Sequence, residues 1–511
     1  MPLSLTRIRS LLLLTLIAVC GSAPALAAPP INGGPDAHRD GVFGPLFAWP
    51  LNAIHAALLP DGRVMTFGTD GDGTQGASMI YDLWDPTKGT TAASHTTVGN
   101  NTQTDFFCCA MLLIPKNGKL ILTGGDITRN GRRNFSTADV NIFNPRRNLF
   151  GTTVPMRRPR WYPTLTTLPD ARVLVHGGRE RRDLQDPKAG GNLTPEVYTA
   201  ERSFQDELTG ATSEAAYGTD WYYPHTFVTP KGRVWFATEA GRHFILDTDG
   251  TGAIKELPRI TETRFEAAAA FAWNQGRAVI TGGHAGGFAT DRTWNVNLWK
   301  QEPEVTPGPT LNQPRTEHDA TILADGSVLI SGGSARWNRL DGVGDQAELW
   351  EPRTKAFRPV ARAGQPRLYH STALLLPDAT VLTAGGGSPG PVTQLNGELY
   401  YPPYLFKKDG SGELADRPEL RWAEAIRYNR DSQIGVRHGK PIREVRLVKT
   451  GAVTHANNMD QRTIRLEFSQ SDTVITARGP YNSAWATPGY WMLFLIDSDG
   501  VPSVARIIKL I

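Results

Sequence analysis

A repeated unit is the feature that most constrains the fold of this chain. Each copy has a β-rich run, a tight turn resembling Leu-Pro-Asp-Gly, a second β-rich run and a glycine-rich end. Clear copies are "LLPDGRVMTFG" (58–68), "LIPKNGKLILTGG" (113–125), "TLPDARVLVHGG" (167–178), "ILADGSVLISGG" (322–333) and "LLLPDATVLTAGG" (374–386). β-rich repeats of about 40–50 residues with glycine punctuation predict propeller blades of the kelch type. Helical solenoids would need helical periodicity, and a β-helix would need shorter repeats.

The spacing of the Gly-Gly pairs predicts seven blades. The first glycine of each pair falls at 124, 177, 282, 332 and 385, and the second of these intervals is about twice the others. That interval contains "VTPKGRVWFATEAG" (228–241), which keeps the turn and lacks the pair. With the unit that ends at Gly68, the count is seven. We therefore predict an all-β protein with a seven-bladed kelch-type β-propeller.

A second domain follows the repeats. After "YYPPYLF" (400–406) comes a polar, turn-rich segment, and short alternating β runs continue to Ile511. Such a boundary and such strands are typical of a small immunoglobulin-like β-sandwich. We expect the propeller over residues 28–404 and the sandwich over 405–511.

The N-terminus predicts export. Arg7 and Arg9 precede a short apolar run at 11–19, and a small-x-small site ends at Ala27. These are the parts of a signal peptide over residues 1–27. We expect a secreted, periplasmic or cell-envelope protein without a membrane span. The net charge of +4, from 54 basic and 50 acidic residues, argues against a nucleic-acid partner, and we expect a monomer.

The cysteines are unusual for an exported chain. Of three, Cys20 leaves with the signal peptide, so only the adjacent pair Cys108 and Cys109 remains. Exported proteins normally pair distant cysteines, whereas neighbours form only a strained vicinal disulfide. Either both thiols are buried and inert, or at least one has a chemical role.

The turn proline serves as a ruler for equivalent positions in the blades. Seven residues before it lie Cys108, Tyr162, Tyr223 and His370, the last preceded by Tyr369. Equivalent positions of a propeller lie at equivalent points around its axis. We therefore expect Cys108, Tyr162, Tyr369 and His370 to meet at one end of the pore.

These residue types suit a metal centre. Any one of them alone reads as an ordinary packing residue of a strand. Together they offer phenol, imidazole and thiol groups, and phenol and imidazole ligands suit copper. A second imidazole is available from His455 in "KTGAVTHANNMDQR", which we read as a hairpin long enough to reach the pore.

Over nearly the whole mature chain, the sequence resembles the galactose oxidase and glyoxal oxidase family of copper radical oxidases. The motifs are "DFFCC" (105–109), "RPRWYPTLTTLPD" (158–170), "RLYHSTALLLPD" (367–378), "TGAVTHANNMDQR" (450–462) and "PGYWMLFLIDSDGVPSVA" (488–505). The resemblance implies one copper ion held by Tyr162, Tyr369, His370 and His455, and a thioether between Cys108 and Tyr162 that carries a radical. It implies oxidation of an alcohol or aldehyde hydrate while O2 becomes H2O2, with Tyr369 as the base.

Two departures from galactose oxidase stand out. Its N-terminal carbohydrate-binding domain is not expected here, because only a short segment precedes the first blade. Its stacking indole follows the Gly-Gly pair of the Tyr blade, where this chain has Arg179 and Glu180. We predict that Trp294, in a glycine-rich loop after Gly282-Gly283, replaces that indole over the thioether.

The substrate is predicted from the rim. The stretch "DWYYPHTF" (220–227) offers Tyr222, Tyr223 and His225 but no Arg to hold a sugar, and "RTEHDA" (315–320) adds Glu317 and His318. A site without a partner for a sugar hydroxyl rejects that sugar. We therefore expect a small aldehyde of the glyoxal or glycolaldehyde type, or a small primary alcohol.

Three alternatives stay open at this point. One is an alcohol or sugar oxidase that acts like galactose oxidase itself. Another is a non-catalytic kelch propeller that binds a protein or glycan. The third is a cell-envelope protein that forms the copper site without turnover.

Overall fold

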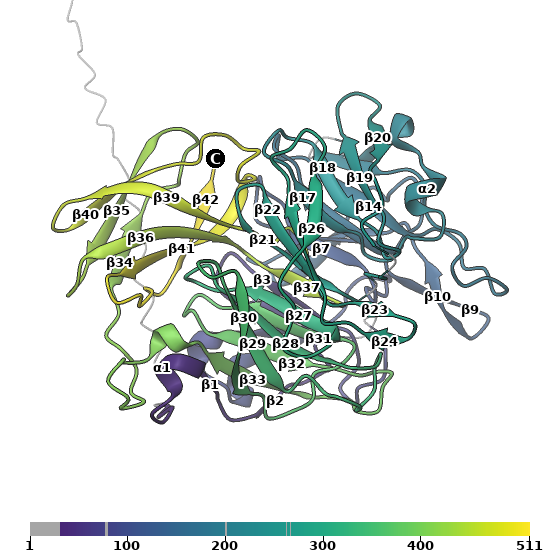
Figure 1. The fold of residues 1–511 in the computed structure, drawn as a ribbon. Coiled ribbons are helices and arrows are strands. Elements are labelled where there is room, and N and C mark those ends of the chain that lie inside the picture. Colours follow the sequence, from purple (N-terminus) through teal and green to yellow (C-terminus); the bar gives the residue numbers. More distant parts are fainter. Residues whose placement is uncertain (1–30, 77–79, 200–201, 262, 266) are drawn as a thin grey trace, which may run out of the picture.

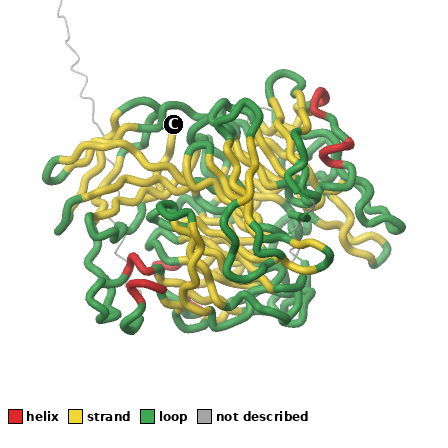
Figure 2. The backbone as a smooth tube through the Cα atoms, viewed as in Figure 1, coloured by secondary structure: helices red, strands yellow, loops and turns green. Residues whose placement is uncertain are grey.

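The computed structural model describes residues 31–76, 80–199, 202–261, 263–265 and 267–511. The predicted signal peptide lies outside them. Strands make up nearly all the regular structure, and the few helical turns lie at the periphery (Figure 2). In the described part of the chain, no helix is long and apolar enough to cross a membrane.

Seven antiparallel sheets form the blades of the predicted propeller (Figure 1). The first blade has β3 (His55–Leu58), β4 (Val64–Phe67), β5 (Ile80–Trp84) and β6 (His95–Gly99). The second has β7 (Ala110–Leu113), β8 (Leu120–Thr123), β11 (Val140–Asn144) and β12 (Leu149–Thr152). The third has β13 (Trp161–Thr167), β14 (Val173–Arg179), β15 (Glu196–Thr199) and β16 (Ser203–Glu207).

The middle blades repeat this order. The fourth has β17 (His225–Val228), β18 (Val234–Ala237), β19 (His243–Asp247) and β20 (Ala253–Glu256). The fifth has β21 (Ala269–Asn274), β22 (Arg277–Thr281), β25 (Thr293–Asn297) and β26 (Glu304–Pro307), and the sixth has β27 (Thr316–Ile322), β28 (Val328–Ser334), β29 (Gln346–Glu351) and β30 (Ala356–Arg362). The fourth blade confirms that the unit without a Gly pair still folds as a blade.

The seventh blade closes the ring with strands from the other end of the chain. Its own strands are β31 (Ser371–Leu375), β32 (Val381–Gly385) and β33 (Asn396–Tyr401). The N-terminal strands β1 (Val42–Phe43) and β2 (Phe47–Ala48) both pair with β33. The first blade is thereby joined to the last, and the outer edge of β33 is covered.

Small elements decorate the blades. Two hairpins project from the second and fifth blades, formed by β9 (Asp126–Arg129) with β10 (Arg132–Ser136) and by β23 (His284–Ala285) with β24 (Phe288–Ala289). The helical turns are α1 (Ala37–Asp40), α2 (Glu214–Tyr217), η1 (Pro86–Lys88), η2 (Ala92–Ser94), η3 (Thr209–Ala211) and η4 (Pro403–Leu405).

The C-terminal domain is a nearly closed seven-stranded sheet in the order β34-β35-β40-β39-β36-β41-β42. Its strands are β34 (Glu419–Ala423), β35 (Asp431–Arg437), β36 (Ile442–Lys449), β39 (Thr463–Gln470), β40 (Val474–Arg478), β41 (Gly489–Asp497) and β42 (Arg506–Leu510). Ile426 and Leu510 bridge in parallel where the two edges approach each other. Trp491 lies fully buried in its separate hydrophobic core.

One hairpin leaves this domain and enters the propeller. It consists of β37 (Ala452–Thr454) and β38 (Asn457–Asn458), with His455 at its turn. β37 pairs with β3, the innermost strand of the first blade, so that Thr454 lies opposite His55. The predicted hairpin is therefore present, and it extends the first blade toward the axis.

Buried ion pairs explain part of the repeat. In three blades an arginine lies two or three residues before the position that the turn identifies. It donates to the carbonyl of the first glycine of the Gly pair and forms an ion pair with a buried glutamate. These pairs are Arg160–Glu196 at 3.0 Å, Arg315–Glu348 at 3.1 Å and Arg367–Glu398 at 3.8 Å. The glycine itself is required, because a Cβ on Gly332 would lie 2.6 Å from the carbonyl oxygen of Arg367 in the next blade, at a φ of +69°.

Candidate metal centre

The residues of the predicted register share one backbone conformation. Cys108, Tyr162, Tyr223, Glu317 and His370 all have positive φ, between 29° and 71°. The left-handed conformation costs a non-glycine residue roughly 1–2 kcal/mol, so each is held there by its surroundings. This shared geometry confirms that the turn proline identifies equivalent positions.

Backbone hydrogen bonds link these positions from blade to blade. The Tyr162 N–H donates to the Cys108 carbonyl at 3.0 Å, and the Tyr223 N–H donates to the Tyr162 carbonyl at 3.1 Å. Farther round, the Glu317 N–H donates to the Ala267 carbonyl at 2.9 Å. The side chains are thereby presented at one level of the axis by a scaffold that does not depend on what they are.

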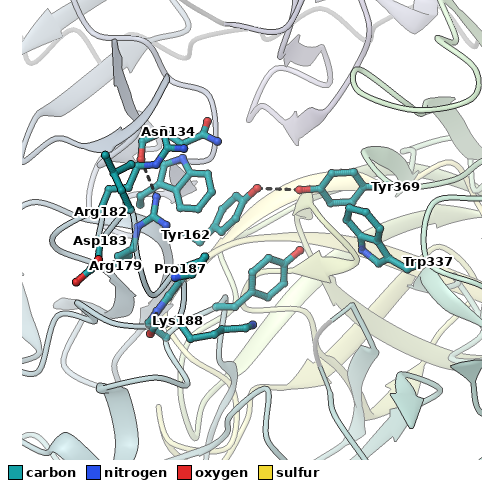
Figure 3. A pocket seen from close by; sticks show the side chains of 13 residues that line it. Asn134, Tyr162, Arg179, Arg182, Asp183, Pro187, Lys188, Trp337 and Tyr369 are labelled. Carbon is teal, nitrogen blue, oxygen red and sulfur yellow. Dashed lines mark hydrogen bonds between the residues drawn. The ribbon is translucent and has the colours of Figure 1, made fainter. Parts of the chain in front are cut away.

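Two phenols from distant blades meet at the axis. The hydroxyl oxygens of Tyr162 and Tyr369 lie 2.8 Å apart and share a hydrogen bond (Figure 3). Burial, and then the neighbouring Cys108 thiol, hold the pKa of Tyr162 well above its usual value. A cation placed between two such hydroxyls would favour loss of their protons, which is the behaviour of a phenolate metal ligand.

Two neutral imidazoles complete the donor set. His370 has its Nδ1 2.9 Å from the Gly387 carbonyl, so Nδ1 carries the proton and Nε2, which is buried without a hydrogen-bond partner, keeps its lone pair. The His455 ring lies 4.5 Å from that of His370 and 4.9 Å from that of Tyr162, centroid to centroid. Burial lowers the pKa of His370 to about 3 and that of His455 well below its usual value. Both rings are therefore uncharged imidazoles at neutral pH, with one nitrogen free to bind a metal, as ligation requires.

The thiol of Cys108 lies beside this donor set. It interacts by a hydrogen bond with the side chain of Tyr162, and its Sγ is 3.9 Å from Nε2 of His455. Cys108 and Cys109 are both buried free thiols, so the vicinal disulfide is not formed in this structure. Cys109 contributes its carbonyl, which accepts the hydroxyl of Tyr223 at 3.0 Å.

The donor set fits copper and depends on the phenols. In the part of the chain that the structure describes, no group of three His, Cys, Asp or Glu side chains could hold a metal ion. The candidate centre therefore combines two imidazoles with Tyr162 and Tyr369. Imidazole nitrogen with anionic oxygen is a donor combination that divalent copper accepts well.

The indole that covers Tyr162 is Trp161 and not Trp294. The rings of Trp161 and Tyr162 stack at 3.9 Å and 27°, whereas Trp294 packs on Phe265 in the core of the fifth blade. Neighbours in a regular strand point to opposite faces, but the positive φ of Tyr162 brings the two adjacent rings to one side. Tyr369 and His370 stack at 3.7 Å and 27° for the same reason.

His55 lies at the centre, although the repeat pattern does not predict it. His55 on β3 accepts the N–H of Cys108 at its Nε2, 3.2 Å away, and stacks on Phe67 at 4.5 Å. Burial holds the pKa of His55 well below its usual value. It fixes the backbone of Cys108, and a lone histidine in "NAIHAALLPDG" gave no reason to expect this.

A cavity of about 380 Å³ opens onto the two phenols (Figure 3). It is lined by Asn134, Trp161, Tyr162, Arg179, Arg182, Asp183, Leu184, Pro187, Lys188, Trp221, Tyr222, Trp337 and Tyr369. Of the predicted rim residues, Tyr222 lies in this lining. Tyr223 lies behind it, fully packed, with its ring 4.9 Å from that of Tyr162.

The other rim residues do not line the cavity. His225, Glu317 and His318 are buried, and His318 has its Nε2 2.9 Å from the hydroxyl of Thr281 on β22. Their positions next to the register are right, but their side chains pack within the propeller. Spacing alone did not distinguish a side chain directed into the blades from one at the mouth.

The rim also contains residues that the sequence reasoning missed. Arg179 and Arg182 follow the Gly pair of the third blade, Lys188 lies in the same loop and Trp337 follows β28. The expectation of a rim without arginine is therefore wrong. Arg179 is the last residue of β14, one position beyond the Gly pair, and the other three lie in loops, so the turn proline places none of them.

The comparisons with known proteins agree with the fold and with the resemblance. Residues 417–510 match the family described as Galactose oxidase-like, Early set domain. Galactose oxidase of Gibberella zeae is 28% identical over 495 residues, which cover 92% of this chain and 70% of that protein. Aldehyde oxidase GLOX1 of Arabidopsis thaliana is 26% identical over 459 residues, which cover 77% of this chain and 70% of that protein.

A solved structure shares the whole architecture. A fungal alcohol oxidase of the AA5 family, in complex with copper, has a TM-score of 0.81 at 23% identity and covers 92% of this chain and 100% of that one. This chain therefore combines a seven-bladed propeller with a galactose oxidase-like Early set domain, and it places tyrosine, histidine and cysteine at the propeller axis. This chain is a homologue of galactose oxidase and of the aldehyde (glyoxal) oxidases.

Proposed function

We propose that this protein is an exported copper radical oxidase that oxidises small aldehydes or primary alcohols and reduces O2 to H2O2. The observation that carries the proposal is the meeting of Tyr162, Tyr369, His370 and His455 beside the thiol of Cys108. The homologous galactose oxidase and aldehyde oxidase support the same reaction class.

Each side chain has a part in the proposed centre. Tyr162, Tyr369, His370 and His455 would hold one copper ion, which supplies a one-electron redox partner when bound. His455 reaches the centre from the C-terminal domain, so copper would tie the two domains together. The hydrogen bonds from His370 to Gly387 and from His455 to Thr454 orient the two rings.

The cofactor would be completed by a covalent bond between Cys108 and Tyr162. Their direct interaction supports a thioether from Sγ to the ring carbon beside the hydroxyl. The S–H and ring C–H hydrogens leave as two protons and two electrons, and O2 accepts them as H2O2. Trp161 stacks on the ring that would carry the radical and covers one of its faces.

Turnover uses the two phenols that face the cavity. Tyr369 would accept the proton of the substrate hydroxyl at its Oη, and Tyr162 in its radical form would take the carbon-bound hydrogen. A hydrated aldehyde presents the same C–H and O–H pair as an alcohol. The substrate leaves with two hydrogens fewer, and these appear in H2O2.

The test is peroxide production by the copper-loaded protein. Glyoxal, glycolaldehyde, small primary alcohols and galactose at equal concentration should separate the classes, with an aldehyde or small alcohol fastest. Tyr162→Phe keeps the fold and the stacking surface but cannot form the radical, so it should be inactive. No peroxide from any compound, or equal turnover by Tyr162→Phe, would overturn the proposal.

A further inference from the structure

The cavity has a cationic end. Two of its lining residues, Arg179 and Arg182, form no ion pair with a carboxylate of the described residues. The other charged lining residues, Lys188 and Asp183, have partners in the protein. Lys188 pairs with Glu239 at 3.1 Å, and the Asp183 carboxylate accepts the N–H of Gln185 at 2.7 Å. The Asp183 carboxylate stays charged, so two arginines against this one carboxylate leave the cavity with a net positive charge.

The guanidinium of Arg179 is fixed by two indole rings and one hydrogen bond. It is 4% exposed, and its guanidinium carbon lies 4.2 Å from the ring centre of Trp161 and 5.2 Å from that of Trp221. Its Nη2 donates to the carbonyl of Asn134 at 2.6 Å, while its Nε is buried without a hydrogen-bond partner (Figure 3). The two indole faces offset part of the cost of burying this cation, and an anion in the cavity would offset more of it.

The electrostatics of Arg179 agree with this geometry. Burial, and then the charge of Arg182, lower the pKa of Arg179 to about 10. The group therefore stays charged at neutral pH, but at a free-energy penalty that a bound anion would relieve.

The cationic end is close to the reacting groups. Arg179 stacks on Trp161, which stacks on Tyr162, so the guanidinium lies two ring layers from the candidate radical site. Figure 3 shows Arg179 and Arg182 on the Tyr162 side of the cavity, with Trp337 beneath Tyr369 on the other side. The arginines and the phenols line the same cavity, so one molecule bound in it can contact both.

We propose that the substrate carries a carboxylate, which Arg179 and Arg182 bind while its aldehyde hydrate or primary alcohol faces Tyr162 and Tyr369. The inference rests on the proposed function and names the substrate class of the same site. A planar guanidinium pairs with a carboxylate through two parallel hydrogen bonds, which fixes orientation as well as charge. The other walls of the cavity are largely aromatic, so we expect the rest of the substrate to be short and uncharged.

A matched pair of compounds isolates the charge. Glyoxylate and methyl glyoxylate present the same hydrated aldehyde and differ in the anionic oxygen. For the copper-loaded protein, we expect kcat/KM for glyoxylate to exceed that for the ester about tenfold or more at low salt. Added NaCl should narrow the difference, because the cavity is open to solvent.

Variants of one loop provide the control. Arg182 is partly exposed, so Arg182→Gln should leave the fold intact and raise the KM for glyoxylate about tenfold more than the KM for the ester. Arg179→Lys keeps the charge but loses the two parallel donors of the guanidinium, so it should also weaken the binding of glyoxylate. Arg181 lies in the same loop, is exposed and does not line the cavity, so Arg181→Gln should change neither compound.

Binding to the copper-free protein tests the inference apart from turnover. Calorimetric titration with glyoxylate should show one site that Arg182→Gln weakens about tenfold and Arg181→Gln does not. No binding, or equal binding by both variants, overturns the carboxylate assignment. Turnover of the ester at least as fast as of glyoxylate also overturns it but leaves the proposed oxidase standing, whereas binding without any turnover overturns the oxidase alone.

Discussion

Acid should destabilise this protein through histidines that the fold keeps neutral. His176, His225 and His318 are buried near the inner strands of the propeller, away from the donor set. Burial lowers their pKa values to about 3, 4 and 3. Each is a base whose pKa is lower in the folded than in the unfolded chain. Its contribution is therefore constant above pH 6.5, and stability falls as the pH decreases from 6.5 toward the folded pKa.

The size of the effect follows from proton linkage. Between pH 7 and pH 5, each unfolded histidine takes up nearly one proton that its folded counterpart refuses, which is worth about 2 kcal/mol. Three such residues remove about 6 kcal/mol, which compares with about 5–15 kcal/mol for the stability of a typical folded protein. In the copper-free protein, His55, His370 and His455 act in the same direction, while Asp319, whose pKa burial raises well above its usual value, acts against them. Asp126, whose pKa is raised to about 6 by burial, recovers about 1 kcal/mol over the same range.

The groups around each histidine support the direction. His176 faces Arg160 and the hydroxyls of Tyr217 and Thr226, while His318 faces Arg315. Among the described residues, neither His176 nor His318 has a carboxylate partner that would stabilise a charged ring. Protonation in place is therefore disfavoured, and the chain gains the proton by unfolding.

The assay is urea unfolding of the copper-free protein, followed by tryptophan fluorescence from pH 7.5 to pH 5. The midpoint should fall steadily below pH 6.5. His176→Gln keeps a hydrogen-bonding group near Thr226 and removes one titrating site, so its pH slope should be shallower by up to about 1.4 kcal/mol per pH unit. A midpoint that does not change with pH, or a variant with the wild-type slope, would refute the reasoning.

Three further outcomes are expected. Copper and oxygen should lower the intact mass by two hydrogens, and Cys108→Ser should prevent this; a loss that instead disappears in Cys109→Ser would assign the bond to the other thiol. His455→Ala should weaken copper binding at least about tenfold and reduce the rise in thermal stability on copper loading, and unchanged affinity would exclude it as a ligand. Trp161→Phe should shorten the radical lifetime measured by electron paramagnetic resonance, whereas Trp294→Phe should not; the reverse result would contradict the stacking seen here.

The repeat allowed the fold and the centre to be predicted together. Its turn proline identifies one backbone position in successive blades, and in the structure Cys108, Tyr162, Tyr223 and His370 all have a positive φ there. Because a propeller places equivalent positions around one axis, spacing along the chain becomes proximity in space. His455 was accessible through a different signal, a hairpin pattern at the right distance from the C-terminal strands.

The remaining features could not be read from spacing. Trp161 was overlooked because period-two alternation sends neighbours to opposite faces, and only the left-handed turn at Tyr162 reverses this. Arg179 ends β14 just beyond the Gly pair and Arg182 lies in the loop that follows, where the repeat pattern has already stopped. Glu317 and His318 show the opposite error, since a correct register position does not tell whether a side chain meets the cavity or packs within the blades.

The hairpin at 452–458 sets an order of assembly. It is made near the end of synthesis, yet it pairs with β3, which belongs to the first blade made. Until the final domain has emerged and folded, the inner edge of β3 has no partner there and the second imidazole is absent from the axis. In the proposed oxidase, copper would therefore enter the finished centre only after the C-terminal domain has folded, and Cys108 would stay an unprotected thiol until then. Copper would have to be delivered after synthesis of the chain rather than during it.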